Sequence, residues 1–247
     1  MTTVRALWRH PIKSHGREAL DQVTLTEGAT MPWDRRWAVA HEAAKADGSE
    51  WAPCANFSRG SKAPGLMAIE AQVDEANGTV TLSHLDQGSM TFDPDGDVTE
   101  FLDWARPLMP ENRAQSARIL RVPGRGMTDT DFPSISLINL ASGVDLGERM
   151  KTDLSPKRWR GNIHFDGLPA WQEFEWVGKT IRVGTAELAV RERIVRCLAT
   201  TANPDTGKRD ADTLGVLNTQ LNHQDFGIYA VVTRSGDVKV GDTIEVL

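Results

Sequence analysis

A single cysteine beside a basic residue is the feature of this sequence that most clearly suggests chemistry. Arg196 and Cys197 end a strand-like run, and two threonines and the turn-forming segment 203–207 follow them. A neighbouring cation favours the thiolate, the form of cysteine that attacks electrophiles or binds metals. A lone cysteine is more often a small buried apolar residue. This segment alone therefore leaves a nucleophile, a metal ligand and a structural thiol open.

Three other short segments place cations beside small or polar residues. They are His10–Gly16, with Lys13 and Ser14; Asp34–Trp37, with Arg35 and Arg36; and Arg158–Ile163, with Arg160 and Asn162. Ammonium, guanidinium, hydroxyl and backbone N–H groups together can hold an oxyanion. Because consecutive strand residues face opposite sides, at most one of the two adjacent arginines points into any one pocket. Each segment alone also fits an ordinary polar turn or a solvated salt bridge.

The overall charge indicates what such a group of cations would bind. The chain has 247 residues and a formal net charge of −6. Nucleic-acid-binding proteins are usually basic, so we expect no nucleic-acid partner. A basic pocket within an acidic chain suits a small anionic ligand better than a polyanion.

Several further classes are excluded by the motifs that are missing. The two cysteines, Cys54 and Cys197, cannot supply the four ligands of a ferredoxin-type iron–sulfur cluster or an all-cysteine zinc site. The six histidines show no paired metal spacing, and no P-loop, G-x-S-x-G or G-x-G-x-x-G motif is present. No run approaches the ~18 apolar residues of a membrane span, and no signal-peptide pattern is visible. We therefore expect no membrane partner and a cytoplasmic location.

The elements that must position these residues are mostly strands. Short alternating or apolar runs between turn residues are typical of barrels and sandwiches. The runs are 4–9, 36–40, 66–73, 79–82, 118–122, 179–183, 186–191, 227–233 and 238–246. Asn77-Gly78 between two of them predicts a β-hairpin. Three short helices are expected, over 98–105, over 141–150 after an Asn139 cap, and over 212–221.

A domain boundary is predicted near the middle of the chain. The segment Pro123–Asp129 is polar, rich in turn residues and without periodicity. We therefore expect two domains, 1–122 and 123–247.

The order of these motifs resembles the MOSC family, whose β-barrel domain is shared by molybdenum-cofactor sulfurases and the mitochondrial amidoxime reducing component. The resemblance extends over nearly the whole chain. It is carried by His10–Ser14, Asp34–Trp37, Asp131–Asn139, Arg160–Ile163, Arg196–Gly207, Phe226–Tyr229 and Val240–Asp242. It implies a mainly β (α+β) fold, in which an N-terminal β-barrel-like domain (1–122) precedes a MOSC β-barrel domain (123–247) with a few short helices.

The resemblance also implies a molybdenum–molybdopterin cofactor (Moco), with Cys197 as the metal ligand. The residues implied to bind the cofactor are Lys13, Ser14, Arg35, Ser134, Arg160, Asn162, Arg196 and Thr200. A thiolate is a suitable soft ligand for such a metal. Arginine and lysine are suited to an anionic, phosphate-bearing cofactor.

The sequence departs from the family pattern at two positions. Ile194 stands where the family often has a second cysteine, and Asn203 stands where an acid is usual. We expect no iron–sulfur cluster of its own and no PLP-binding half. Electrons would therefore come from a separate flavin or iron–sulfur protein.

The function implied is that of an oxidoreductase acting on a small N-hydroxylated or N-oxide substrate. Cys197 would bind the metal, and a carboxylate such as Asp225 or Asp205 would serve as a catalytic proton donor. The alternative is a carrier of the cofactor, or of sulfur as a Cys197 persulfide, without turnover of its own. A third possibility is a barrel without cofactor, active only in protein interactions.

Overall fold

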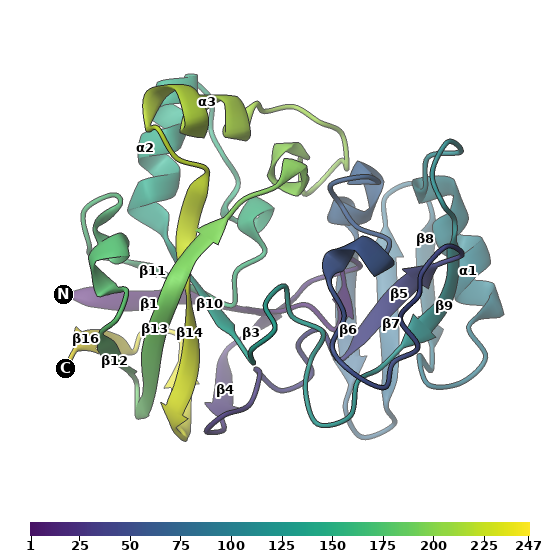
Figure 1. Cartoon of the computed structure of the whole chain (residues 1–247), viewed down its shortest axis with the longest axis horizontal. Coiled ribbons are helices and arrows are strands. Elements are labelled where there is room, and N and C mark those ends of the chain that lie inside the picture. Colours follow the sequence, from purple (N-terminus) through teal and green to yellow (C-terminus); the bar gives the residue numbers. More distant parts are fainter.

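The computed structural model describes all of residues 1–247 and consists of two lobes side by side (Figure 1). One lobe is a closed seven-stranded barrel, in the order β11-β10-β14-β13-β12-β16-β1, in which β11 also pairs with β1. These strands are β1 (Thr2–Arg9), β10 (Ile135–Asn139), β11 (Ile163–Asp166), β12 (Thr180–Val183), β13 (Ala186–Val195), β14 (Asp225–Arg234) and β16 (Thr243–Val246). The first strand of the chain thus closes a barrel whose other strands all come after residue 134.

The barrel closes around a core of alternating apolar side chains. Along β12 and β13, Ile181, Val183, Leu188 and Val190 point inward, as the two-residue period of a strand requires. Beyond Val190 the alternation ends, and β13 shifts register against β14 in two places before the chain turns. Such bulges bend a strand and redirect its end. Here the two bulges lie where β13 leaves the barrel and leads to Cys197.

The second lobe holds two three-stranded sheets around its own core. One sheet contains β2 (Ile12–Lys13), β5 (Trp37–His41) and β9 (Ser116–Leu120); the other contains β6 (Glu70–Asp74), β7 (Thr79–His84) and β8 (Gly88–Phe92). Helix α1 (Thr99–Ala105) packs Phe101 into a core that includes Ile12 and Trp37. The mainly β architecture expected from the sequence is confirmed.

Two short strands from the N-terminal part of the chain pair on the barrel side. Strand β3 (Glu18–Leu20) adds to the edge of β1, and β4 (Gln22–Leu25) pairs with β15 (Gly236–Lys239) from the far end of the chain. Residues near the N-terminus therefore contribute to both lobes. The boundary near residue 123 stays a prediction.

The three expected helices are present. Helix α2 (Leu140–Met150) begins at Asn139, whose side chain accepts a hydrogen bond of 3.1 Å from the N–H of Ala141. Helix α3 (Thr213–Gln220) begins at Asp212, whose carboxylate accepts from the N–H of Gly215. None of the helices is long and apolar enough to cross a membrane.

The hairpin expected at Asn77-Gly78 joins β6 to β7. The strand expected over 66–73 is partly wrong. Residues Pro64–Ala68 form a 3₁₀ turn and the strand begins at Glu70. Pro64 stands at the first position of that turn, where the fixed φ of proline favours a helical start over a strand.

Candidate functional site

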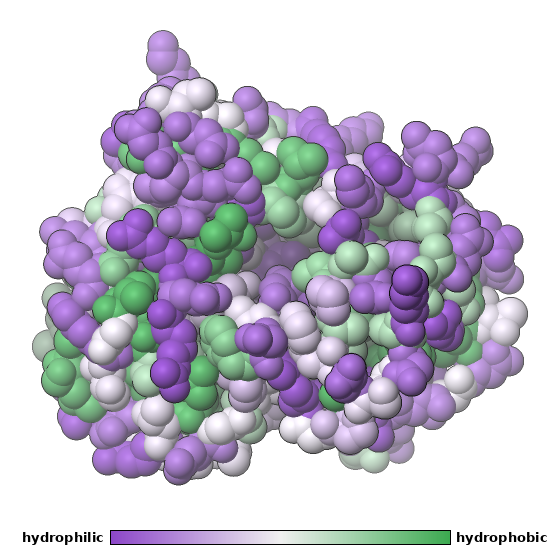
Figure 2. Space-filling view, viewed as in Figure 1, coloured by the Kyte–Doolittle hydropathy of each residue, from purple (hydrophilic) through white to green (hydrophobic).

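A cavity of about 310 Å³ lies between the two lobes. Figure 2 shows this hollow in the middle of the molecule, with apolar and polar side chains on its edge. The N-terminal lobe contributes Lys13, Ser14, Arg35, Cys54, Arg59, Gly60, Ser61 and Met67. The barrel side contributes Asp129, Ser136, Arg158, Trp159, Arg160, Ile194, Val195, Arg196, Cys197, Ala199, Thr200 and Tyr229.

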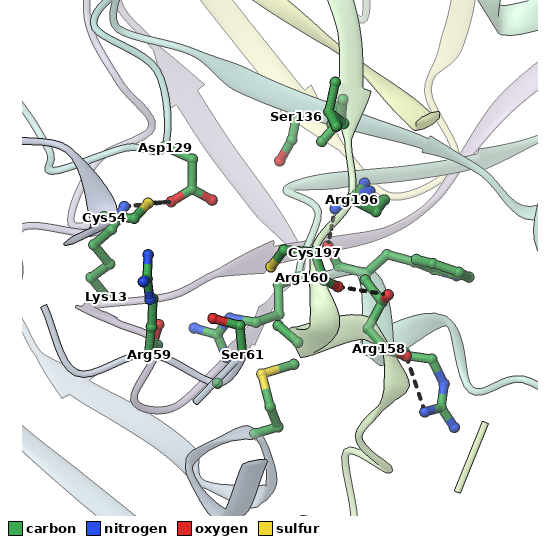
Figure 3. A pocket seen from close by; sticks show the side chains of 18 of the residues that line it. Lys13, Cys54, Arg59, Ser61, Asp129, Ser136, Arg158, Arg160, Arg196 and Cys197 are labelled. Atoms are coloured by element: carbon green, nitrogen blue, oxygen red, sulfur yellow. Dashed lines mark hydrogen bonds and ion pairs between the residues drawn. The ribbon is translucent and has the colours of Figure 1, made fainter. Parts of the chain in front are cut away.

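Cys197 is exposed on the barrel side of this cavity, just beyond the end of β13 (Figure 3). A 3₁₀ turn over Leu198–Thr201 follows it, and both the N–H and the hydroxyl of Thr200 donate to the Cys197 carbonyl at 3.1 Å. The buried Arg158 holds this turn by donating to the carbonyls of Thr200 and Ala202, at 3.2 and 2.7 Å. The backbone around the thiol is therefore fixed while the thiol itself stays accessible.

Two arginines beside Cys197 keep buried donors free. Arg196 donates to the carbonyls of Phe226 and Trp159, at 2.8 and 2.9 Å, but its remaining Nη2 has no partner. Arg160 donates to the carbonyl of Gly16 at 3.0 Å, and its Nη1 has no partner. Buried polar groups are nearly always paired. Because both side chains line the cavity, these two donors are available to the acceptor atoms of a ligand bound there.

The charges of these arginines are only partly compensated. Burial, reinforced by Arg35 and Arg17 nearby, lowers the pKa of Arg160 to about 9. Burial likewise lowers the pKa of Arg196 to about 10. Neither forms an ion pair with an acid, although both stay charged at neutral pH. An anionic ligand would stabilise both charges.

Three residues lining the cavity have left-handed backbone conformations. Ser14, Arg35 and Arg160 have φ values of 64°, 49° and 48°. Such a conformation costs a non-glycine residue about 1–3 kcal/mol and persists only where the surrounding structure enforces it. The residue after Arg160 must be glycine, because a Cβ on Gly161 would lie 2.2 Å from the Ile138 side chain.

Arg35 links the two lobes beneath the cavity. It pairs with the fully buried Asp34 and donates to the carbonyl of Arg160 at 2.9 Å. Burial alone would raise the pKa of Asp34, but Arg35 and His10 outweigh it and hold that pKa well below its usual range. The next residue, Arg36, lies instead over the ring of Trp33, 4.3 Å from its centroid. Of the two adjacent arginines, only Arg35 lines the cavity.

A second thiol lies on the N-terminal side of the cavity. Cys54 donates a hydrogen bond of 3.2 Å to Asp129, which also pairs with Lys13. Burial, together with the charge of Asp129, raises the pKa of the Cys54 thiol to about 11. Lys13 also donates to the carbonyls of Met127 and Thr128, at 2.9 and 3.1 Å. Through these contacts Lys13 connects the segment around residue 128 to the N-terminal lobe.

The remaining expected residues divide between this cavity and its surroundings. Asn162 and Ser134 line a small adjoining pocket that shares Arg35, Asp129, Ser136 and Tyr229 with the cavity. Asn162 accepts from the Ser136 hydroxyl at 2.7 Å and donates to the carbonyl of Trp8 at 3.2 Å. Its side chain thus connects β10 to β1, directly before β11 begins.

Asp225 is not among the residues that line the cavity. Its carboxylate lies 3.8 Å from Arg193 at the start of β14. Its role as a proton donor stays a prediction. Asn203, at the position where an acid was expected, accepts from the N–H groups of Asp205 and Thr206 and so forms a turn.

Sequence reasoning missed a group of residues that only the fold brings to the cavity. They are Arg59, Ser61, Met67, Asp129, Ser136 and Tyr229. Ser136 and Tyr229 lie within motifs that carry the family resemblance, but those motifs do not single out their side chains. Arg59, Ser61, Met67 and Asp129 lie outside the motifs, and their only local signal was Arg59 close to Cys54, a pair that also fits an ordinary surface loop.

Comparisons with known proteins agree with this architecture. Residues 1–106 match the MOSC N-terminal beta barrel domain, and residues 128–245 match the MOSC domain. The YUAD protein from Bacillus subtilis superimposes with a TM-score of 0.51 at 15% identity, covering 100% of this chain and 96% of that one. At that identity the similarity shows a shared fold.

Among curated proteins, the chain is similar to mitochondrial amidoxime reducing components. It is 31% identical over 127 residues to component 2 from Homo sapiens, covering 46% of this chain and 37% of that protein. It is 28% identical over 153 residues to component 1 from Homo sapiens, covering 57% and 44%. The matched region therefore spans less than half the length of these relatives.

Proposed function

Because the chain belongs to the MOSC family, with a MOSC N-terminal barrel followed by a MOSC domain, we propose that it is a molybdenum-cofactor-dependent oxidoreductase. Its proposed substrates are small N-hydroxylated or N-oxide compounds. The observation that carries the proposal is the pair of free, buried guanidinium donors of Arg160 and Arg196 beside the exposed Cys197.

The side chains of the cavity fit a metal that arrives already chelated by an anionic ligand. Six cationic side chains line the cavity, and a bare metal cation would be repelled by them. A metal that is already held in an anionic, phosphate-bearing pterin would instead be attracted by these cations. Cys197 supplies one soft thiolate ligand, and Arg160 and Arg196 supply donors to the anionic groups.

The other residues of the proposed set hold these groups in place. Ser14 lines the cavity wall, and Arg35 fixes the backbone of Arg160. Thr200 fixes the carbonyl of Cys197, and Asn162 joins the strands behind the cavity. A molybdenum centre held there, with Cys197 as its ligand, would supply two-electron redox chemistry at the metal. Electrons would come from a separate flavin or iron–sulfur protein.

Cleaving an N–O bond and releasing water consumes two electrons and two protons. Of the groups lining the cavity, the Cys54 thiol holds its proton at neutral pH, because its pKa is about 11. Asp129 stays ionised, because Lys13 and Arg35 outweigh the effect of burial and hold its pKa well below the usual range. Because an ionised carboxylate can only accept hydrogen bonds, the Cys54 S–H donates to Asp129, and this contact fixes the orientation of the S–H.

The exposure of Cys197 also fits a carrier of sulfur. A persulfide would add about 32 Da to the peptide that contains Cys197. Mass spectrometry of the protein as isolated distinguishes this alternative, which predicts the added mass without bound molybdenum.

Turnover tests the proposed activity. Benzamidoxime is incubated without oxygen with the molybdenum-loaded protein and chemically reduced benzyl viologen, and benzamidine is measured. We expect benzamidine from the wild-type protein and background levels from Cys197→Ser. Molybdenum-loaded protein that reduces neither amidoximes nor N-oxides would refute the proposal.

A further inference from the structure

The six cations of the cavity differ in whether an acid compensates them. Three are paired: Lys13 with Asp129, Arg35 with Asp34 and Arg158 with Asp210. Three have no acidic partner: Arg59, Arg160 and Arg196. The last two lie beside Cys197 and belong to the proposed cofactor site. Arg59 is left as an uncompensated charge on the other lobe.

The backbone of Arg59 is firmly held. Directly before it, the N–H of Ser58 donates to the carbonyl of Val39 at 2.9 Å, and the Ser58 hydroxyl lies 2.8 Å from that of Ser116. The carbonyl of Arg59 itself accepts from the N–H groups of Lys62 and Ala63, each at 2.9 Å. The side chain therefore projects from a rigid base.

The guanidinium of Arg59, by contrast, makes no hydrogen bond or ion pair with the rest of the chain. It is partly exposed and lines the cavity. Figure 3 shows it on the same side as Lys13 and Cys54, away from Arg158 and Arg196. A rigidly based, unpaired guanidinium facing a cavity is suited to bidentate binding of a carboxylate or a similar anion.

Apolar side chains line part of the cavity, beside the polar Ser61 and the charged Arg160. Met67 belongs to the N-terminal lobe, and Ile194 and Ala199 flank Cys197 on the barrel side. Gly60, next to Arg59, packs so closely on Met67 that a Cβ would lie 2.4 Å from its sulfur. These side chains provide an apolar surface against which the apolar body of a substrate, such as an aromatic ring, would pack.

From this arrangement we infer that Arg59 selects substrates that carry an anionic group at the end opposite the reacting nitrogen. The inference rests on the proposed function for the identity of the reacting end. The substrate class is then an N-hydroxylated compound with an apolar body and a carboxylate or similar anion. The phosphate of the cofactor is the other anion that Arg59 could bind, and the test separates the two.

The test compares two probes that differ by one carboxylate. The affinities of benzamidoxime and 4-carboxybenzamidoxime are measured by calorimetry on the molybdenum-loaded protein, with Arg59→Gln, Arg59→Lys and Arg113→Gln as variants. Arg113 is an exposed arginine of the same lobe that does not line the cavity, so it controls for the loss of charge. Bound molybdenum is measured in every variant.

We expect the wild-type protein to prefer the carboxylated probe by about tenfold, as one charge-assisted hydrogen bond would give. Arg59→Gln removes the preference, Arg59→Lys keeps part of it, Arg113→Gln keeps all of it, and all retain molybdenum. The inference is overturned if the wild-type protein shows no preference, or if Arg59→Gln keeps it. Loss of molybdenum in Arg59→Gln also overturns it, because Arg59 would then bind the cofactor. Since affinity is measured without turnover, a preference in a protein that reduces neither probe would refute the proposed activity alone.

Discussion

The guanidinium of Arg35, in the N-terminal lobe, donates a hydrogen bond of 2.9 Å to the main-chain carbonyl of Arg160, in the barrel lobe. Arg160 has a left-handed backbone, and its side chain keeps a free donor in the cavity. Arg35 thus fixes the backbone from which the Arg160 side chain projects. Because the other terminal nitrogen of the same guanidinium, Nη1, pairs with the buried Asp34, the contact also fixes the two lobes relative to each other.

Replacing Arg35 by lysine tests this link. A lysine keeps the charge but lacks the planar fork that reaches Asp34 and the Arg160 carbonyl together. We expect Arg35→Lys to lower the free energy of unfolding by about 2 kcal/mol, measured by urea denaturation. Arg36→Lys is the matched control, because Arg36 only lies over aromatic rings, and it should cost about 1 kcal/mol or less. Equal losses in the two variants would contradict the link.

Arg160 is expected to serve ligand binding more than folding. Its side chain makes one hydrogen bond to the rest of the chain and has no acidic partner. Arg160→Gln should therefore change the free energy of unfolding of the cofactor-free protein by no more than about 1 kcal/mol. Bound molybdenum should fall at least about tenfold, since a charge-assisted contact is lost. Full molybdenum in this variant would remove Arg160 from the cofactor site.

Much of this architecture is predictable from local signals. Asn139 is a helix cap that the sequence shows directly, and Asn77-Gly78 marks a hairpin. The Arg196-Cys197 segment suggests chemistry from its residue types, although only the family resemblance gives Cys197 the role of a metal ligand. In each case the physical cause lies within a few neighbouring residues.

The rest depends on contacts between distant parts of the chain. Strand β1 joins the barrel through β11 and β16, more than 150 residues away in sequence, and no local pattern reveals such pairing. Asp129 and Cys54 meet for the same reason, since they are separated by 75 residues. Asp225, chosen for its chemistry alone, lies beside Arg193 and outside the cavity lining.

The acid stability of the protein should depend on a buried histidine. Burial, with a smaller effect of Arg196, lowers the pKa of His164 to about 3. The unfolded chain therefore binds a proton below its ordinary pKa of about 6.5, while the folded protein does not. The stabilising effect is complete above that pH and is lost progressively as the pH falls towards 3.

Urea denaturation at pH 7 and pH 4.5 measures this effect. Between these values His164 should account for a loss of roughly 2 kcal/mol. His164→Gln should reduce the difference between the two pH values by about that amount. An unchanged difference would show that His164 is protonated in the folded protein as readily as in the unfolded one.

The two thiols should differ sharply in reactivity. Cys197 is exposed, whereas burial and Asp129 raise the pKa of Cys54 to about 11 and keep it protonated. Because the thiolate is the reactive form, iodoacetamide at pH 7.5 should label Cys197 in the cofactor-free protein and leave Cys54 largely unmodified. Asp129→Asn should increase labelling of Cys54. Peptide mass mapping reads both sites, and equal labelling in the wild-type protein would contradict the assignment.

The central claim is that Cys197 and the arginines beside it hold a molybdenum cofactor. Elemental analysis of protein produced in a host that makes the cofactor tests it most directly, with Cys197→Ser and Cys54→Ser alongside. The account predicts near-stoichiometric molybdenum in the wild-type protein and in Cys54→Ser, and its loss in Cys197→Ser. Folded wild-type protein without molybdenum, or undiminished molybdenum in Cys197→Ser, would contradict it.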